Sequence, residues 1–190
     1  MKVLGIDQSL SKCAFVLIKE GKVEYTKLSK TGASKVKTQR KDTTYYETLQ
    51  EQIHHICVDL KDVVHITQPD SITFEALSFG SVGDATRNLA CLYGAMRETL
   101  ISIGYEGTVT EVAPTSLKSY AHTFLDEKDK WDGVTKSGKP KKIKMDKKLM
   151  VSSVRNIYGD KYLSEYNYST GLDDLADATF LAHKTWTENA

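Results

Sequence analysis

Short apolar runs along this 190-residue chain predict β-strands wherever turn-forming residues bound them. Three such runs follow one another at the start, with Glu20-Gly21 as a turn signal between the second and the third. Two later runs are rich in β-branched and aromatic residues. The predicted strands cover residues 2–7, 13–19, 22–29, 71–75 and 108–112.

Elsewhere the apolar residues recur three and four positions apart, which is the spacing of an amphipathic helix. The predicted helices cover residues 43–60, 84–103, 114–122, 143–158 and 171–186. Asp42 or Thr43 suits the N-cap of the first helix, and Asp84 suits that of the second. Two predicted loops lie between elements: residues 30–42 are polar and basic, and residues 126–140 are charged and contain glycine.

The order of these elements predicts an α/β fold. Three consecutive strands followed by strand–helix alternation favour a mixed sheet, antiparallel at one side and parallel at the other, with helices on its faces. The length is sufficient for one hydrophobic core, and the sequence contains no internal repeat. We therefore expect a single domain over residues 1–190.

The composition is that of an ordinary globular protein, with 40% hydrophobic and 27% charged residues. No stretch approaches the roughly 18 consecutive apolar residues of a membrane span, and the N-terminus does not have the pattern of a signal peptide. The cysteines Cys13, Cys57 and Cys91 lie far apart, without a Cys-x-x-Cys pair. This pattern is typical of reduced thiols, so we expect a cytoplasmic protein with no membrane partner.

The net charge of +1 conceals two basic clusters. The first has no acid and contains Lys27, Lys30, Lys35, Lys37, Arg40 and Lys41. The second has one acid, Asp146, among Lys136, Lys139, Lys141, Lys142, Lys144, Lys147 and Lys148. One interpretation is solvated loops with surface lysines. Two clusters on a nearly neutral chain favour the other interpretation, a nucleic acid bound on one face.

Acidic residues stand at positions where local structure alone does not require them. Asp7 closes the first predicted strand and Glu75 closes the fourth, although Asp is a poor strand former. Asp7 is either a turn residue of the hairpin or a ligand at the carboxyl edge of a sheet. Asp174 and Asp177 are one helical turn apart and share a face. For Asp173 we favour a simple acidic first turn of the last helix.

Together these carboxylates predict a site for a hard divalent cation. Oxygen ligands without histidine or cysteine select Mg²⁺ or Mn²⁺ over zinc. Several carboxylates cannot all stay ionised close together unless a cation compensates them. Since paired ions of this kind hydrolyse phosphodiesters, we expect a nuclease that uses Mg²⁺, with Mn²⁺ able to substitute.

Four ordered segments resemble the motifs of the RuvC family of Holliday junction resolvases. They are Gly5-Ile6-Asp7-Gln8-Ser9, Thr73-Phe74-Glu75, Val112-Ala113-Pro114-Thr115-Ser116-Leu117-Lys118 and Asp174-Leu175-Ala176-Asp177-Ala178. The resemblance implies an RNase H-like fold with a mixed five-stranded sheet and helices on both faces. It also implies a homodimeric, Mg²⁺-dependent endonuclease that nicks two strands of a four-way DNA junction.

The resemblance also implies roles for individual residues. Asp7, Glu75, Asp174 and Asp177 match the metal ligands, and Lys118 matches a lysine near the scissile phosphate. Lys144 and Lys147 both fit a second lysine of the family, and Phe79 is the nearest match to an aromatic that stacks on bases. Lys37, Arg40 and Lys41, in the first basic cluster, complete the expected DNA contacts.

Two departures from the family pattern affect these expectations. Gln8-Ser9 replaces the common Pro-Gly, which suggests a divergent, viral-type member working in the cytoplasm of its host. A longer insert at residues 125–140, containing Trp131, either adds DNA contacts or is a mobile insertion. The alternatives to a resolvase are another RNase H-like nuclease, acting on branched DNA or an RNA–DNA hybrid, and a non-catalytic junction-binding protein.

Overall fold

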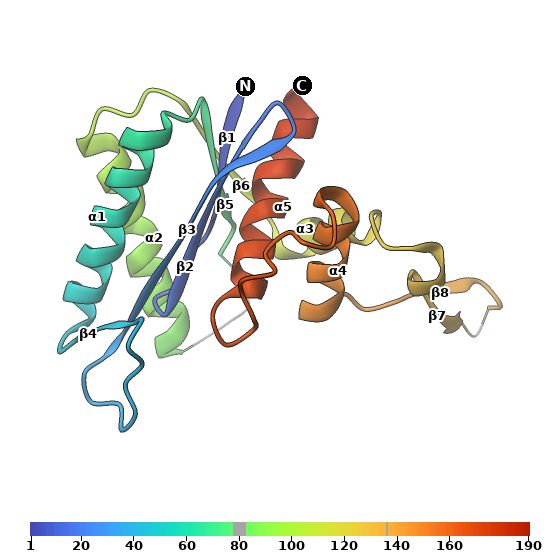
Figure 1. Cartoon of the computed structure of the whole chain (residues 1–190), viewed down its shortest axis with the longest axis horizontal. Helices are drawn as coiled ribbons and strands as arrows, with labels where there is room; N and C mark the ends of the chain where they lie inside the picture. The colour runs from blue at the N-terminus through green and yellow to red at the C-terminus, as the bar shows by residue number, and fades with distance from the viewer. Residues whose placement is uncertain (78–82, 136) are drawn as a thin grey trace.

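The computed structural model describes residues 1–77, 83–135 and 137–190. A mixed sheet lies between two layers of helices, and a two-stranded hairpin projects from one side (Figure 1). Among the described helices, none has both the length and the apolar character that crossing a membrane requires.

The sheet has six strands in the spatial order β4-β3-β2-β1-β5-β6. The strands are β1 (Lys2–Asp7), β2 (Lys12–Lys19), β3 (Lys22–Ala33), β4 (Thr44–Tyr46), β5 (Ser71–Glu75) and β6 (Thr108–Val112). The pairs β1–β2 and β2–β3 are antiparallel, whereas β1–β5, β5–β6 and β3–β4 are parallel. The expected mixed sheet is therefore confirmed, with one strand more than the five expected.

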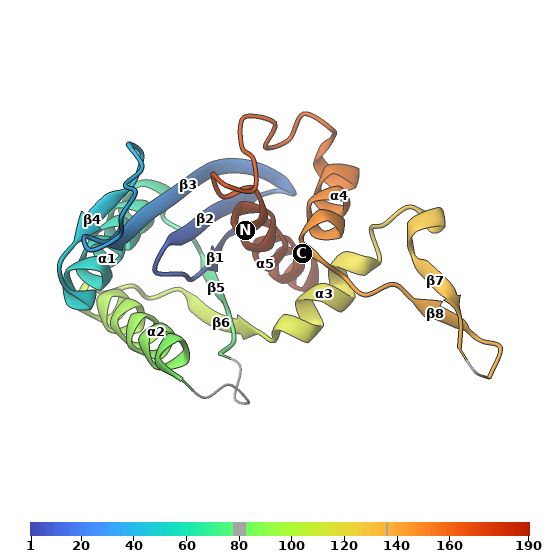
Figure 2. The ribbon, with the colours of Figure 1, turned by 90° about the horizontal axis from the view of Figure 1, so that it is seen from below.

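Helices cover both faces of the sheet, as expected (Figures 1 and 2). The helices are α1 (Leu49–Thr67), α2 (Asp84–Ser102), α3 (Pro114–His122), α4 (Lys147–Tyr158) and α5 (Leu172–Asn189). Helices α1 and α2 pack together on one face, and α5 lies across β1 and β2 on the other. Helices α3 and α4 pack on the outer side of α5.

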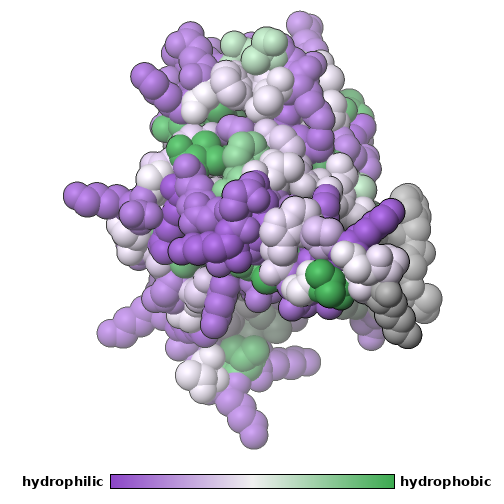
Figure 3. Space-filling view, turned by 90° about the vertical axis from the view of Figure 1, so that its right-hand side faces the viewer, coloured by the Kyte–Doolittle hydropathy of each residue, from purple (hydrophilic) through white to green (hydrophobic). Residues whose placement is uncertain are grey.

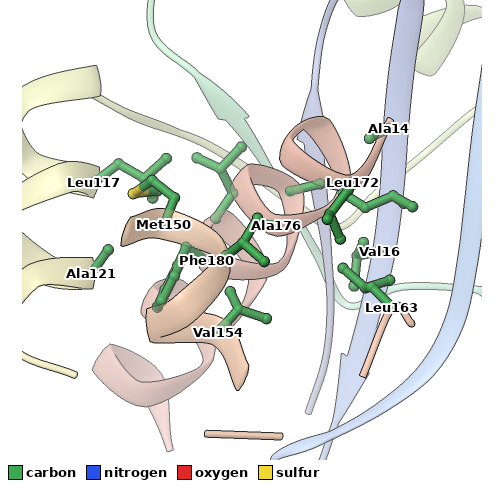
Figure 4. Close-up of a cluster of buried hydrophobic side chains, with 14 of the residues drawn as sticks. Ala14, Val16, Leu117, Ala121, Met150, Val154, Leu163, Leu172, Ala176 and Phe180 are labelled. Carbon is green, nitrogen blue, oxygen red and sulfur yellow. The ribbon is translucent and has the colours of Figure 1, made fainter. Parts of the chain in front are cut away.

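Strand β2 is buried on both faces because alternate side chains enter two different hydrophobic clusters. Phe15 and Leu17 join the cluster under α1 and α2, whereas Ala14 and Val16 join the cluster under α5. Figure 4 shows the second cluster, in which Phe180 of α5 lies among side chains of α3 and α4. Burying a side chain of this size contributes about 1.5–3 kcal/mol, so α5 is firmly anchored.

Gly5 allows α5 to approach the sheet at backbone distance. A Cβ atom at Gly5 would lie 2.0 Å from the carbonyl oxygen of Ala178 and 2.6 Å from the backbone nitrogen of Ala182. Only glycine leaves room for such an approach. The contact holds the middle of α5 against β1, and the acids of α5 lie on the turns that precede it.

The largest difference from the sequence prediction lies between β3 and α1. Strand β3 continues to Ala33, inside the predicted basic loop, and residues 44–46 form β4 instead of a first helical turn. Helix α1 starts at Leu49 because Thr48 and Glu51 form a capping box, so neither Asp42 nor Thr43 is its cap. Its buried side continues beyond residue 60 to Thr67.

The predicted loop at residues 126–140 also contains regular structure. It consists of the 3₁₀ turn η1 (Glu127–Asp129) and the hairpin strands β7 (Trp131–Val134) and β8 (Pro140–Lys142). Helix α4 begins at Lys147 rather than Ile143, because the side chain of Asp146 caps it by accepting a hydrogen bond from the Leu149 N–H at 2.9 Å. Asp84 is the first residue of α2, and Gly83 holds the cap position.

Candidate functional site

Asp7 and Glu75 lie side by side at one edge of the sheet. Strands β1 and β5 are parallel neighbours in which Ile6 is paired with Phe74, so the next residue of each strand is one of these two acids. This is the carboxyl edge of the parallel strands, where α/β folds place their ligands. The structure thus brings together the two strand-end carboxylates that the sequence separates by 68 positions.

Helix α5 adds three more acids to this edge. Asp173 and Asp174 lie in its first turn, Asp177 follows one turn later, and the Gly5 contact holds the next turn of α5 against β1. Asp173 is only 4% exposed. We name Asp7, Glu75, Asp173, Asp174 and Asp177 the acidic cluster.

The carboxylates of the acidic cluster raise one another's pKa values. Burial, followed by repulsion from Asp177 and Glu75, raises the pKa of Asp7 well above its ordinary value. Burial, followed by the charge of Glu75, raises the pKa of Asp177 to about 7. Burial is also the main cause that raises the pKa values of Glu75 and Asp174. The protein alone therefore holds these acids at a free-energy cost that a cation would relieve.

Buried oxygen atoms in the cluster lack hydrogen-bond partners among the described residues. They are Oδ1 of Asp173, Oδ2 of Asp174, Oδ1 of Asp177 and Oε1 of the adjacent Gln8. Unsatisfied buried acceptors are uncommon and call for an explanation such as an ion. All of them are hard oxygen donors, so the residues present fit Mg²⁺ or Mn²⁺ chemically.

The described side chains do not yet form a closed coordination shell. Within residues 1–77, 83–135 and 137–190, no three His, Cys, Asp or Glu side chains are placed to hold one ion together. The acids lie on neighbouring elements at the same edge of the sheet.

Three lysines approach the acidic cluster from different elements. The positive charge of Lys118, on α3, lowers the pKa of Glu75 and of Asp177, against the larger effect of burial. Lys147, the first residue of α4, donates a hydrogen bond to Oδ2 of Asp173. Lys12 Nζ lies 3.7 Å from Oδ2 of Asp174.

The structure separates the two candidates for the second lysine. Lys147 contacts the acidic cluster through Asp173, and this hydrogen bond raises the pKa of Lys147. Lys144 instead lines a hollow beside α3, together with Lys118. Asp173 is thus buried and paired with a lysine, whereas the sequence favoured a simple acidic first turn.

Sequence reasoning missed Lys12 and Gln8. Lys12 opens β2, whose pairing with β1 puts it near the end where Asp7 lies, a relation readable from the hairpin register. Gln8 donates a hydrogen bond from Nε2 to the backbone oxygen of Glu75, so it ties the ends of β1 and β5 together. No sequence signal gives this contact, because it depends on β1 and β5 being neighbours.

The first basic cluster also lies near the acids. The guanidinium Nη1 of Arg40 donates to the Ser169 carbonyl at 2.7 Å, and Lys12 Nζ donates to the Tyr168 carbonyl at 3.1 Å. Both carbonyls belong to the segment that leads into α5. Lys37 and Lys41 are exposed in the same loop. Phe79, the expected stacking aromatic, lies outside the described residues.

Neither protein-family models nor the sequences of curated proteins give a match to this chain. Solved structures with a similar fold do match it. The chain aligns over its whole length with 97% of Thermus thermophilus RuvC in complex with a Holliday junction substrate, with 18% sequence identity and a TM-score of 0.65. The fold is that of RuvC.

Two further RuvC-like structures support this assignment of the fold. A second structure of Thermus thermophilus RuvC aligns over 99% of this chain and 97% of its own, with 19% identity and a TM-score of 0.64. The mitochondrial Holliday junction resolvase of yeast aligns over 95% of this chain and 75% of its own, with 15% identity and a TM-score of 0.56. The RuvC-like architecture expected from the sequence motifs is therefore confirmed.

Proposed function

We propose that this RuvC-like protein is an endonuclease that resolves four-way DNA junctions in recombination and repair. The observation that carries the proposal is the meeting of Asp7, Glu75, Asp174 and Asp177 at one edge of the sheet, beside Lys118. The RuvC fold supports it, because one solved protein with this fold is in complex with a Holliday junction substrate. The proposal treats residues 1–190 as one nuclease domain.

The four acids are the proposed ligands of Mg²⁺, and Mn²⁺ is expected to substitute. An ion bound there supplies a Lewis acid that polarises a phosphate and lowers the pKa of water. Lys118 is the proposed group that stabilises negative charge developing on the phosphate. Lys12 and Lys147 compensate the charge of Asp174 and Asp173, and so link β2 and α4 to the start of α5.

DNA contacts are proposed on both sides of the acidic cluster. The proposed contact residues are Phe79, Lys118, Lys144, Lys147, Lys37, Arg40 and Lys41. Because these contacts are mostly electrostatic, the affinity should fall steeply with salt. A homodimer would present two such sites to one junction and make paired nicks. We propose that the protein acts on DNA in the cytoplasm.

The test is a comparison of substrates at equal concentration in Mg²⁺: a four-way junction, a Y-fork, a linear duplex and an RNA–DNA hybrid. We expect symmetric paired nicks in the four-way junction and little cleavage of the duplex or the hybrid. Preferential cleavage of the hybrid would instead identify another RNase H-like nuclease. Junction binding without any nicking would identify a non-catalytic binding protein.

A further inference from the structure

The β7–β8 hairpin projects from the body of the protein (Figures 1 and 2). Every residue of both strands is exposed, including the apolar Val134 at 69%. An isolated two-stranded hairpin is marginally stable in water. Such an arm gains order when it lies along a partner surface.

The root of the hairpin is fixed to α3 through the backbone carbonyl group of Lys130, which also joins the two chain segments of the root. The Lys130 oxygen lies 2.9 Å from Nε2 of His122, on α3, and accepts from the Ile143 N–H at 3.0 Å. The rings of Trp131 and His122 form a T-shaped pair, with ring centroids 6.2 Å apart. The direction in which the arm leaves α3 is therefore defined.

A hollow of about 280 Å³ lies between α3 and the chain that leaves the hairpin. We name it the root hollow. It is lined by Thr115, Lys118, Ser119, His122, Lys142, Ile143, Lys144 and Met145. No carboxylate is among these residues, whereas lysines and small hydroxyl side chains are the groups that contact phosphates in protein–DNA complexes.

The lysines of the root hollow differ from their neighbours in ion pairing. Lys130 pairs with Glu127 at 2.6 Å, and Lys141 pairs with Asp132 at 2.9 Å. Lys142 projects to the opposite face from Lys141, because side chains alternate along a strand. Neither Lys142 nor Lys144 forms an ion pair with a described residue. Figure 3 looks onto this side of the molecule, where hydrophilic residues predominate.

Lys118 belongs both to the root hollow and to the surroundings of the acidic cluster. It lines the hollow, and its charge reaches Glu75 and Asp177. A strand whose phosphate lies at the acidic cluster therefore has a positively charged path from Lys118 to Lys144 and Lys142. The same path leads outward along the hairpin.

We propose that the root hollow binds the phosphodiester backbone of the DNA strand next to its cleavage position, and that the β7–β8 hairpin guides the adjoining DNA arm. This inference rests on the proposed nuclease function, and it assigns to Lys142 and the hairpin a role in holding substrate. The insert at residues 125–140 then adds DNA contacts and is not merely a mobile insertion.

The test uses the double variant Lys142→Ala/Lys144→Ala in an Asp7→Asn protein, so that binding is measured without cleavage. Because both lysines are exposed, the fold should be unaffected, and a thermal melt checks this. We expect the Kd for a four-way junction to rise about tenfold near physiological salt, with a salt slope smaller by about two. The matched control is Lys22→Ala/Lys61→Ala, which removes the same charge at the far end of the sheet and should leave the Kd within about twofold.

A second variant shortens the arm. Replacing residues 132–141 with Asn-Gly joins Trp131 to Lys142, which are register partners in the hairpin. In the protein with Asp7 intact, this change should raise the KM for the junction more than it lowers kcat. If both sets of variants match the control in Kd, salt slope and KM, the root hollow does not bind DNA.

The results also separate this inference from the nuclease proposal. A wild-type protein that cuts junctions, together with root-hollow variants that bind normally, would overturn only the inference. A wild-type protein that never cuts, yet binds DNA with the predicted dependence on Lys142 and Lys144, would overturn only the nuclease function. Binding of a polyglutamate peptide in place of DNA would show that the hollow is an acidic-peptide site, and would overturn the inference.

Discussion

At the scale of single residues, Asp177 is an acid that the protein alone cannot keep fully ionised near neutral pH. Burial and the charge of Glu75 raise its pKa to about 7, whereas an aspartate in an unfolded chain has a pKa of about 3.9. Between these two values the folded protein binds more protons than the unfolded chain. The stability of the metal-free protein must then fall as the pH rises through this interval.

Asp177→Asn should remove part of this pH dependence. In EDTA, the melting temperature of the variant minus that of the wild type should be larger at pH 7.5 than at pH 5. A difference of several degrees is expected, because 1 kcal/mol shifts the Tm of a domain of this size by about 2–4 °C. The lowered pKa of buried His183 acts in the opposite direction, but it is common to both proteins and cancels.

Differential scanning fluorimetry at the two pH values gives the required comparison. Adding Mg²⁺ at pH 7.5 should raise the Tm of the wild type more than that of Asp177→Asn. An equal Tm difference at both pH values would show that the folded structure does not raise the pKa of Asp177.

Acidic residues at positions that disfavour them could be recognised as functional candidates from the sequence. Asp7 and Glu75 end buried strands, so their positions indicate a function before any contact is known. The choice between Lys144 and Lys147 could not be made, because it depends on where α4 begins. Asp146 sets that start, and only then does Lys147 fall beside Asp173.

At the scale of elements, the site depends on the backbone contact between β1 and α5. Gly5→Ala would place a methyl group 2.0 Å from the Ala178 carbonyl oxygen, so the helix or the strand must move. We expect this variant to lose the cooperative fold or to melt at least about 10 °C lower, since overpacking and strain cost several kcal/mol.

Gly94→Ala is the matched control. A Cβ atom at Gly94, in the middle of α2, would meet nothing within 4 Å, so Gly94 does not serve close packing against the sheet. Because alanine is the better helix former by about 1 kcal/mol, this variant should melt about 2–4 °C higher. Circular dichroism melts check both. A Gly5→Ala protein as stable as the wild type would mean that α5 does not hold Asp177 against β1.

Elements with local signals could be predicted, and elements made by distant pairing could not. Strand β6 and helix α3 have the predicted bounds because a β-branched run and Pro114 mark them in the sequence. Strand β4 forms because it pairs with the end of β3. From the sequence alone, Tyr46 fits the helical spacing of Leu49 and Ile53, so the pattern predicts a helix there. The β7–β8 hairpin has no buried face, so its sequence lacks the alternation of apolar and polar residues that predicts a strand.

At the scale of the whole molecule, the residues of the proposed site lie at one end of the sheet. The chain termini lie at the opposite end in Figure 1. Around the acidic cluster, the basic loop before β4 approaches through Arg40, strand β2 through Lys12, and the root hollow through Lys118. A net charge of +1 thus conceals an acidic centre with basic flanks, which suits a phosphate backbone that crosses a metal site.

We propose that the acids at this edge catalyse metal-dependent cutting of a four-way junction. The direct measurement is the nicking of an end-labelled synthetic junction by the wild type and by Asp7→Asn, in Mg²⁺ and in EDTA. We expect paired symmetric nicks by the wild type only when Mg²⁺ is present, and junction binding without nicking by Asp7→Asn. Nicking by Asp7→Asn at the wild-type rate, or wild-type nicking that persists in EDTA, would contradict it.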